Sequence, residues 1–156
     1  MCAFAPAGRA EAKIEDVASF KGAQVTGVTV SDKGRIFVNF PRWREQIPCS
    51  VAEVRKDGSY TPYPDEKTNR WEKGMPGDGD AFVCVQSVVA DGDRLYVIDT
   101  KNPMIGKTVA VPALYVYDLN TDKLVRKYPL AESTSPDSYV NDPVSYTHLT
   151  LPTIRL

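Results

Sequence analysis

Apolar and polar residues alternate with a period of two through most of this chain, in short runs separated by turn-forming residues. Such alternation is typical of β-strands that bury one face. The 10 Gly and 12 Pro are spread along the whole sequence, which argues against long helices. The pattern therefore predicts an all-β fold without a defensible helix, with strands at residues 25–30, 35–40, 51–54, 59–61, 83–89, 94–99, 113–119 and 123–128.

The order of these runs repeats. Gly-Arg-Ile-Phe-Val at residues 34–38 returns as Asp-Arg-Leu-Tyr-Val at residues 93–97, and Tyr-Pro closes both units at residues 63–64 and 128–129. A four-strand unit that recurs at about 60 residues is typical of β-propeller blades. A third unit is expected to begin at residues 138–144. Since two blades cannot close a ring, we expect the chain to be part of a larger propeller.

The two ends differ from the middle. Residues 1–20 are rich in small side chains and predict a leader or signal-peptide remnant, with a short strand at residues 14–20. Residues 21–144 form the predicted propeller part. Residues 145–156 lack the expected Asp/Gly turn and are interpreted as a non-native read-through tail. The single histidine, His148, lies in that tail, so the rest of the chain offers no His for a catalytic triad or a metal site.

Charge and cysteine content narrow the function classes. The formal net charge is −1, which gives no electrostatic reason to expect a nucleic-acid partner. No apolar run reaches the roughly 20 residues of a membrane span. Cys49 and Cys84 form no CxxC pair and predict either two half-buried thiols or, in an exported protein, one disulfide.

Polar residues on the innermost strands are the first candidates for chemistry. Gln86 interrupts the apolar run of residues 83–89. Asn141 and Asp142 lie in the segment at which the third unit is expected to begin. An amide beside a carboxylate at a channel mouth can orient a polar ligand or ligate a hard cation such as Ca²⁺. The alternative for Asp142 is a capped turn. Asp99, at the end of a predicted strand, is interpreted as a turn-former rather than a base.

Two aromatic residues in connecting segments are further candidates. Trp43 lies between Arg42 and Arg44, and this triplet predicts either an anion-binding or ring-stacking group or a loop held by one buried indole. Trp71, in the long polar segment of residues 65–80, is expected to pack against a sheet, with ligand stacking as the alternative.

The ordered set of motifs at residues 27–38, 82–88, 94–99 and 138–142 resembles the major royal jelly/Yellow family, which includes bacterial Yellow-related and dopachrome-tautomerase-related proteins. The resemblance implies a six-bladed propeller, usually secreted, with a central channel that binds a small aromatic or amine ligand and no required cofactor. Of the motif positions, Gln86, Asn141 and Asp142 are carried over from the resemblance. Together with Arg42 and Trp43, which are candidates from their chemistry alone, they are the predicted ligand-binding residues.

Two other function classes stay open at this point. A lactonase-like hydrolase on a similar scaffold would hold a divalent metal such as Ca²⁺ at Asn141 and Asp142, with Glu15 as a further ligand. A non-catalytic interaction propeller would present an apolar patch on one face. Whether the protein is an enzyme is left undecided by the residues.

Overall fold

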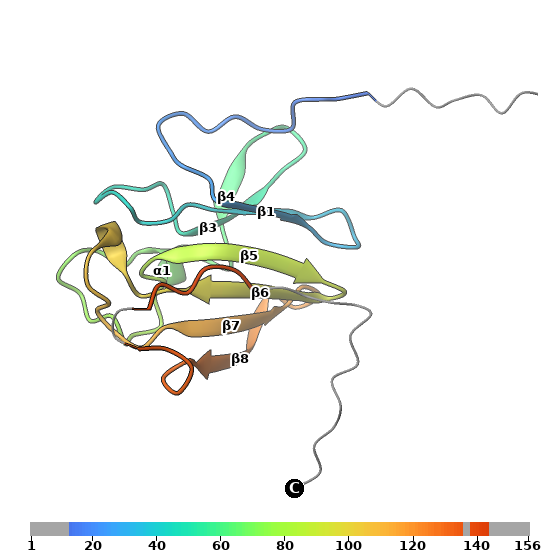
Figure 1. The fold of residues 1–156 in the computed structure, drawn as a ribbon. Helices are drawn as coiled ribbons and strands as arrows, with labels where there is room; N and C mark the ends of the chain where they lie inside the picture. Colours follow the sequence, from blue (N-terminus) through green and yellow to red (C-terminus); the bar gives the residue numbers. More distant parts are fainter. Residues whose placement is uncertain (1–12, 136–137, 144–156) are drawn as a thin grey trace, which may run out of the picture.

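A computed structural model describes residues 13–135 and 138–143 of the chain, and in them nearly all regular structure is β (Figure 1). The strands form two four-stranded antiparallel sheets, each in sequence order. The first sheet contains β1 (Gly27–Val30), β2 (Ile36–Asn39), β3 (Val51–Val54) and β4 (Tyr60–Pro62), and the second contains β5 (Val85–Asp91), β6 (Arg94–Asp99), β7 (Ala113–Asp118) and β8 (Lys123–Pro129). This confirms the predicted all-β class and is consistent with two consecutive propeller blades.

The turns follow from the residues that the pattern singled out. Gly34 and Gly92 have φ angles of 76° and 56°, a region that L side chains rarely enter. Gly34 lies between β1 and β2, and Gly92 lies between β5 and β6. Both sheets therefore begin with a tight turn that uses a glycine, but the turns differ in length: three residues separate the Ser31–Arg35 pair, whereas two separate the Asp91–Arg94 pair.

The main core lies between the two sheets. From the first sheet come Phe37 in β2 and Tyr63 directly after β4. They pack against residues of the second sheet and of the segment before it, and all are almost fully buried: Phe82, Leu95 and Tyr117. The rings meet edge to face, with Tyr63 and Tyr117 centroids 5.7 Å apart. Edge-to-face aromatic pairs add about 0.5–1.5 kcal/mol to the energy of burial, so the sheets form one packed unit.

A smaller cluster covers the other face of the first sheet. Phe20 packs its ring against Phe40, with centroids 5.3 Å apart, and against Tyr60. The strand predicted at residues 14–20 is wrong for its described part, since residues 13–20 form no strand. The segment instead contributes single apolar side chains to this face, because no neighbouring strand of the described residues offers it a ladder of hydrogen bonds.

A one-turn helix was missed by the sequence pattern. α1 (Glu66–Asn69) is capped by Asp65, whose side chain accepts a hydrogen bond from the Thr68 N–H at 2.7 Å, and four residues are too few for a 3.6-residue period to show. The helix positions the Asn69 amide, which is buried and accepts from the N–H groups of Ser50 and Val51 at 2.9 Å. This amide ties the connection after β4 to the start of β3.

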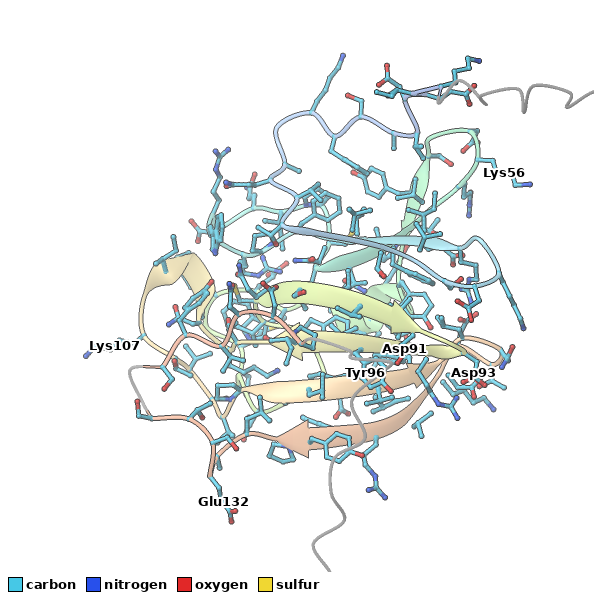
Figure 2. The ribbon with its side chains drawn as sticks, turned by 45° about the vertical axis from the view of Figure 1, so that its right-hand side comes forward. Lys56, Asp91, Asp93, Tyr96, Lys107 and Glu132 are labelled. Atoms are coloured by element: carbon cyan, nitrogen blue, oxygen red, sulfur yellow. The ribbon has the colours of Figure 1, made fainter. Side chains whose placement is uncertain are left out.

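The second sheet has two distinct ends. Figure 2 shows Asp91 and Asp93 at the β5–β6 turn and Lys107 at the opposite end. We call that opposite end the loop end. It comprises residues 83–86, around the start of β5, and residues 99–105, from the last residue of β6 through the 3-10 turn η1 (Pro103–Ile105).

At the other end, which contains the β5–β6 turn and which we call the turn end, Arg35 joins the two sheets. Its Nε and Nη2 donate to the two Glu53 carboxylate oxygens at 2.7 Å, and its Nη1 donates to the Leu119 carbonyl at 2.7 Å and to Asp122 at 2.8 Å. Such a two-pronged pair fixes a guanidinium more firmly than a single contact would. These charge-assisted bonds raise the pKa of Arg35 above its ordinary value, against the opposing effect of partial burial.

The start of the expected third unit is not a strand in the part that the structure describes. Residues 138–143 have no ladder partner there and run as an extended segment beside β5 and β6 (Figure 1). Most of the predicted leader, the rest of the predicted third-unit start and the predicted read-through tail lie outside the described residues. In the described ranges there is no helix of the length and apolarity needed to cross a bilayer.

Candidate functional site

The start of β5 is irregular, and this irregularity positions Gln86. The register between β5 and β6 shifts between Val85 and Ser87, so that Gln86 has no directly opposed residue. A bulge of this kind re-aims a side chain away from the regular alternation of a strand. The neighbouring sheet then holds the site, because Thr26 Oγ1 donates to the Gln86 carbonyl at 2.9 Å and Asn39 Nδ2 donates to the Val85 carbonyl at 3.0 Å.

Tyr139 joins three segments that are far apart in the sequence. Its hydroxyl donates to Gln86 Oε1 at 2.9 Å and accepts from the indole N–H of Trp43 at 2.8 Å. Burial raises the pKa of Tyr139, and the hydrogen bond from Trp43 opposes that shift. The phenol is therefore a neutral donor at ordinary pH. We refer to Gln86, Trp43 and Tyr139 together as the tyrosine hub.

A buried ion pair lies beneath the tyrosine hub. The Asp99 carboxylate accepts hydrogen bonds from the backbone N–H groups of Val83, Cys84 and Lys101 at 2.8–3.0 Å. It also pairs with Lys101 Nζ at 2.9 Å, and both side chains are within 1% of full burial. Buried charges need such pairing and additional hydrogen bonds. Asp99 therefore fixes the backbone that leads into β5, which agrees with the predicted structural role.

The loop after Asp99 has a strained backbone. Lys101, Met104 and Ile105 have φ angles of 54°, 58° and 52°, although none is a glycine and Ile is β-branched. Two hydrogen bonds hold this conformation: the Met104 N–H donates to the Arg42 carbonyl at 2.6 Å, and the Val109 N–H donates to the Lys101 carbonyl at 2.8 Å. Strain of this kind persists only where the surroundings over-determine it.

Arg42 and Trp43 are adjacent in sequence, but their side chains contact different parts of the structure. The Trp43 indole N–H reaches the tyrosine hub, whereas the Arg42 guanidinium lies 5.4 Å from the Trp71 ring centre. Arg42 is only 6% exposed, and its Nε and Nη1 donate to the carbonyls of Val83 and Glu45. Arg44 is exposed. The predicted triplet therefore does not form one cluster.

Asn141 and Asp142 lie two and three residues beyond Tyr139 and are exposed. They share the extended segment of the tyrosine hub but no hydrogen bond joins them to the described residues, so their ligand-binding role stays a prediction. Glu15, the third residue of the metal alternative, pairs with Lys13 near the start of the described chain. Within the described ranges, no group of three or more His, Cys, Asp or Glu side chains could hold a metal ion.

The cysteines and Trp71 match one of the two alternatives stated for each. Cys49 and Cys84 are free and buried, and burial raises the pKa of the Cys49 thiol to about 12. Burial also raises the pKa of Cys84, beside which Thr100 and Tyr139 lie. Trp71 is 3% exposed and packs against Val83 and Cys84. It is therefore a packing residue, as expected.

The central residue of the site, Tyr139, was not predicted as such. The sequence placed it at the beginning of a strand, where an aromatic residue is ordinary, and its partners are 53 and 96 residues away. The burial of Lys101 was also not predicted, because lysine side chains are almost always exposed to solvent. The one available signal was the polar Gln86 inside an apolar run, and the Tyr139 hydroxyl donates to the side chain of that residue.

Comparison with known proteins gives a consistent set of relatives, and no family model matches the chain. The chain is 36% identical to the protein named yellow from Drosophila erecta, over 123 residues that cover 68% of this chain and 21% of that protein. Identity is 35% to the yellow protein of Drosophila yakuba and 34% to that of Drosophila melanogaster, over the same length. The chain spans about a fifth of the length of these relatives.

Proposed function

This chain is related by family to the Yellow and major royal jelly proteins, and on that premise we propose that it is part of an exported propeller that binds a small aromatic or amine ligand. The tyrosine hub is the place proposed for binding, at the loop end of the second sheet. β1 and β5 are the first strands of their sheets and lie side by side, joined by the hydrogen bond from the Ala90 N–H to Thr29 Oγ1 at 2.8 Å. First strands line the central channel of a propeller.

The observation that carries this proposal is the hydrogen-bonded Tyr139 hydroxyl. It joins the innermost strand, the loop after β2 and the segment of residues 138–143 at one point. Tyr139 is 36% exposed and Trp43 is half-buried, so both rings combine a fixed position with an accessible face. Aromatic faces of this kind bind rings and organic cations.

An exposed carboxylate on the same segment as Tyr139 suits an amine. Asp142 is three residues beyond Tyr139 in the sequence and is exposed, and a carboxylate forms strong charge-assisted hydrogen bonds with an ammonium group. The Gln86 side-chain oxygen Oε1, which already accepts from Tyr139 in the hub, offers a further acceptor. The proposal concerns binding only and assigns no reaction.

Fluorine NMR on the chain labelled with 5-fluorotryptophan tests the proposal. The sequence has 2 Trp, and the Trp43→Phe variant assigns their two resonances. We expect phenethylamine to shift the Trp43 resonance saturably, and Tyr139→Phe to weaken this binding about tenfold, because the variant loses the hydroxyl whose hydrogen bonds hold Gln86 and Trp43 in place. The Tyr128→Phe variant, on the exposed strand β8, is the matched control. A Trp43 resonance that does not respond to phenethylamine would refute the proposal.

A further inference from the structure

A cavity that none of the tyrosine hub residues lines lies between the segment after β2 and the segment after α1. It has a volume of about 620 Å³ and its wall includes Arg42, Trp71 and four further charged residues: Glu45, Arg70, Glu72 and Lys73. This volume is within the range of small-ligand sites. The wall residues come from the loop between β2 and β3, from Asn69 at the end of α1, and from the connection that follows α1.

The buried guanidinium in this wall has no ionic partner. Arg42 is 6% exposed, and none of the ion pairs among the described residues involves it. Its Nε and Nη1 donate to the Val83 and Glu45 carbonyls at 3.0 and 3.1 Å, whereas Nη2 has no hydrogen bond in the described part of the chain. Buried charges in proteins are normally paired, and a guanidinium nitrogen without a hydrogen bond can donate to an anionic ligand.

The surroundings fix where a partner would bind. The guanidinium lies over the Trp71 ring at 5.4 Å from its centre, and two of its three nitrogens are already fixed by carbonyls. Desolvation lowers the pKa of Arg42, with Cys84, Asp99 and Glu72 opposing this shift from a distance. The exposed side chains of Arg70 and Lys73 add positive charge to the cavity rim.

We propose that this cavity binds a small carboxylate ligand, with the carboxylate on Arg42 Nη2 and the ligand body against the Trp71 indole. The rim cations Arg70 and Lys73 strengthen the attraction, and the rim anions Glu45 and Glu72 favour a ligand that also has an amino group. This site is independent of the proposed amine site, since it shares none of the three residues of the tyrosine hub.

The test uses the intact chain with 5-fluorotryptophan and follows the Trp71 resonance, which the Trp43→Phe variant identifies. Phenylacetate is the probe and phenethylamine, with the same ring and the opposite charge, is its control. We expect phenylacetate to shift the Trp71 resonance saturably and phenethylamine to leave it in place. Arg42→Gln should weaken phenylacetate binding at least tenfold, because a charge-assisted hydrogen bond is lost.

Matched variants keep the test decisive. Arg44→Gln removes an exposed arginine two residues from Arg42 that does not line the cavity, and it should bind phenylacetate as the unmodified chain does. The double variant Arg70→Gln/Lys73→Gln changes only exposed rim residues and should weaken binding several-fold. This second variant decides the question if Arg42→Gln fails to fold, as judged by circular dichroism.

Three outcomes would overturn the proposal: no saturable response of Trp71 to phenylacetate, an equal response to phenethylamine, or undiminished binding in the rim double variant. The readouts also separate this proposal from that of the amine site. Failure of the amine site leaves the Trp43 resonance unmoved by phenethylamine, whereas failure of the carboxylate site leaves the Trp71 resonance unmoved by phenylacetate.

Discussion

Replacing Asp99 by alanine should destabilise the chain more than any other single change at the loop end. The carboxylate is fully buried and accepts three backbone N–H bonds at 2.8–3.0 Å. It is also the ionic partner of Lys101 at 2.9 Å. Alanine would leave three buried donors without their acceptor and one buried ammonium without its counter-charge. The ammonium would keep the Ala81 carbonyl at 3.2 Å and the face of the Tyr115 ring, at 5.6 Å from the ring centre.

The size of this effect follows from its parts. An orphaned buried donor costs about 1–3 kcal/mol, and breaking a buried ion pair from one side costs about 3–5 kcal/mol. These contributions overlap because they share one carboxylate, so we expect Asp99→Ala to lower the free energy of unfolding by about 4–6 kcal/mol in total. Asp99→Asn keeps one good acceptor oxygen and should lose about 2–3 kcal/mol.

Urea unfolding followed by tryptophan fluorescence measures these free energies. Lys101→Met leaves the three N–H bonds in place, and the double variant Asp99→Asn/Lys101→Met should cost less than the sum of its single variants by at least about 1 kcal/mol. Glu132→Ala, on the exposed segment after β8 (Figure 2), is the control and should stay within about 0.5 kcal/mol of the unmodified chain. A loss below about 1 kcal/mol for Asp99→Ala, or strictly additive single variants, would refute this account of the buried pair.

Other parts of the structure make further predictions. Arg35→Met should lower the free energy of unfolding by about 1–2 kcal/mol in dilute buffer and by less in 1 M NaCl, because the Arg35 pairs are partly exposed and salt screens them; an effect equal at both salt concentrations would contradict this. Gly27→Ala should cost about 1–3 kcal/mol, since its new Cβ would overlap Asn39 Oδ1 and meet the Val88 backbone nitrogen at 3.3 Å, whereas Gly79→Ala has only one neighbour, at 3.9 Å, and should be tolerated. Cys49 should resist a thiol reagent at pH 8 until urea unfolds the chain. Because its folded pKa of about 12 exceeds the unfolded value of 9.0, its contribution to stability is complete below pH 9 and is lost as the pH rises above that value; rapid labelling of the folded chain would show the thiol to be accessible.

The regular part of the fold could be predicted because it depends on local signals. Alternation of period two and the turns at Gly34 and Gly92 placed all eight strands within a few residues of their observed bounds. The exceptions are segments whose state depends on a distant partner. Residues 14–20 have strand-like composition but no neighbouring strand in the described chain, and their side chains serve as a cover for the first sheet.

The candidate site could be predicted only in part, because its geometry depends on contacts over long sequence distances. Gln86 was found because a polar residue in an apolar run needs an explanation. Tyr139 was not, since nothing local distinguishes it from other aromatic strand residues. Arg42 and Trp43 looked like one group, yet they lie in an irregular segment where neighbouring side chains follow neither strand nor helix alternation.

The strained loop after Asp99 has a consequence for the kinetics of the native state. Residues in the left-handed region cost of order 1 kcal/mol or more each, so local opening of residues 101–105 releases energy that opening elsewhere in the second sheet does not. The Met104 N–H donates to the Arg42 carbonyl. We therefore expect its amide to exchange with deuterium earlier than most hydrogen-bonded amides of the second sheet and its loops. Each opening also frees the Arg42 carbonyl, which precedes Trp43, so the loop after Asp99 supports the backbone that carries one residue of each proposed site.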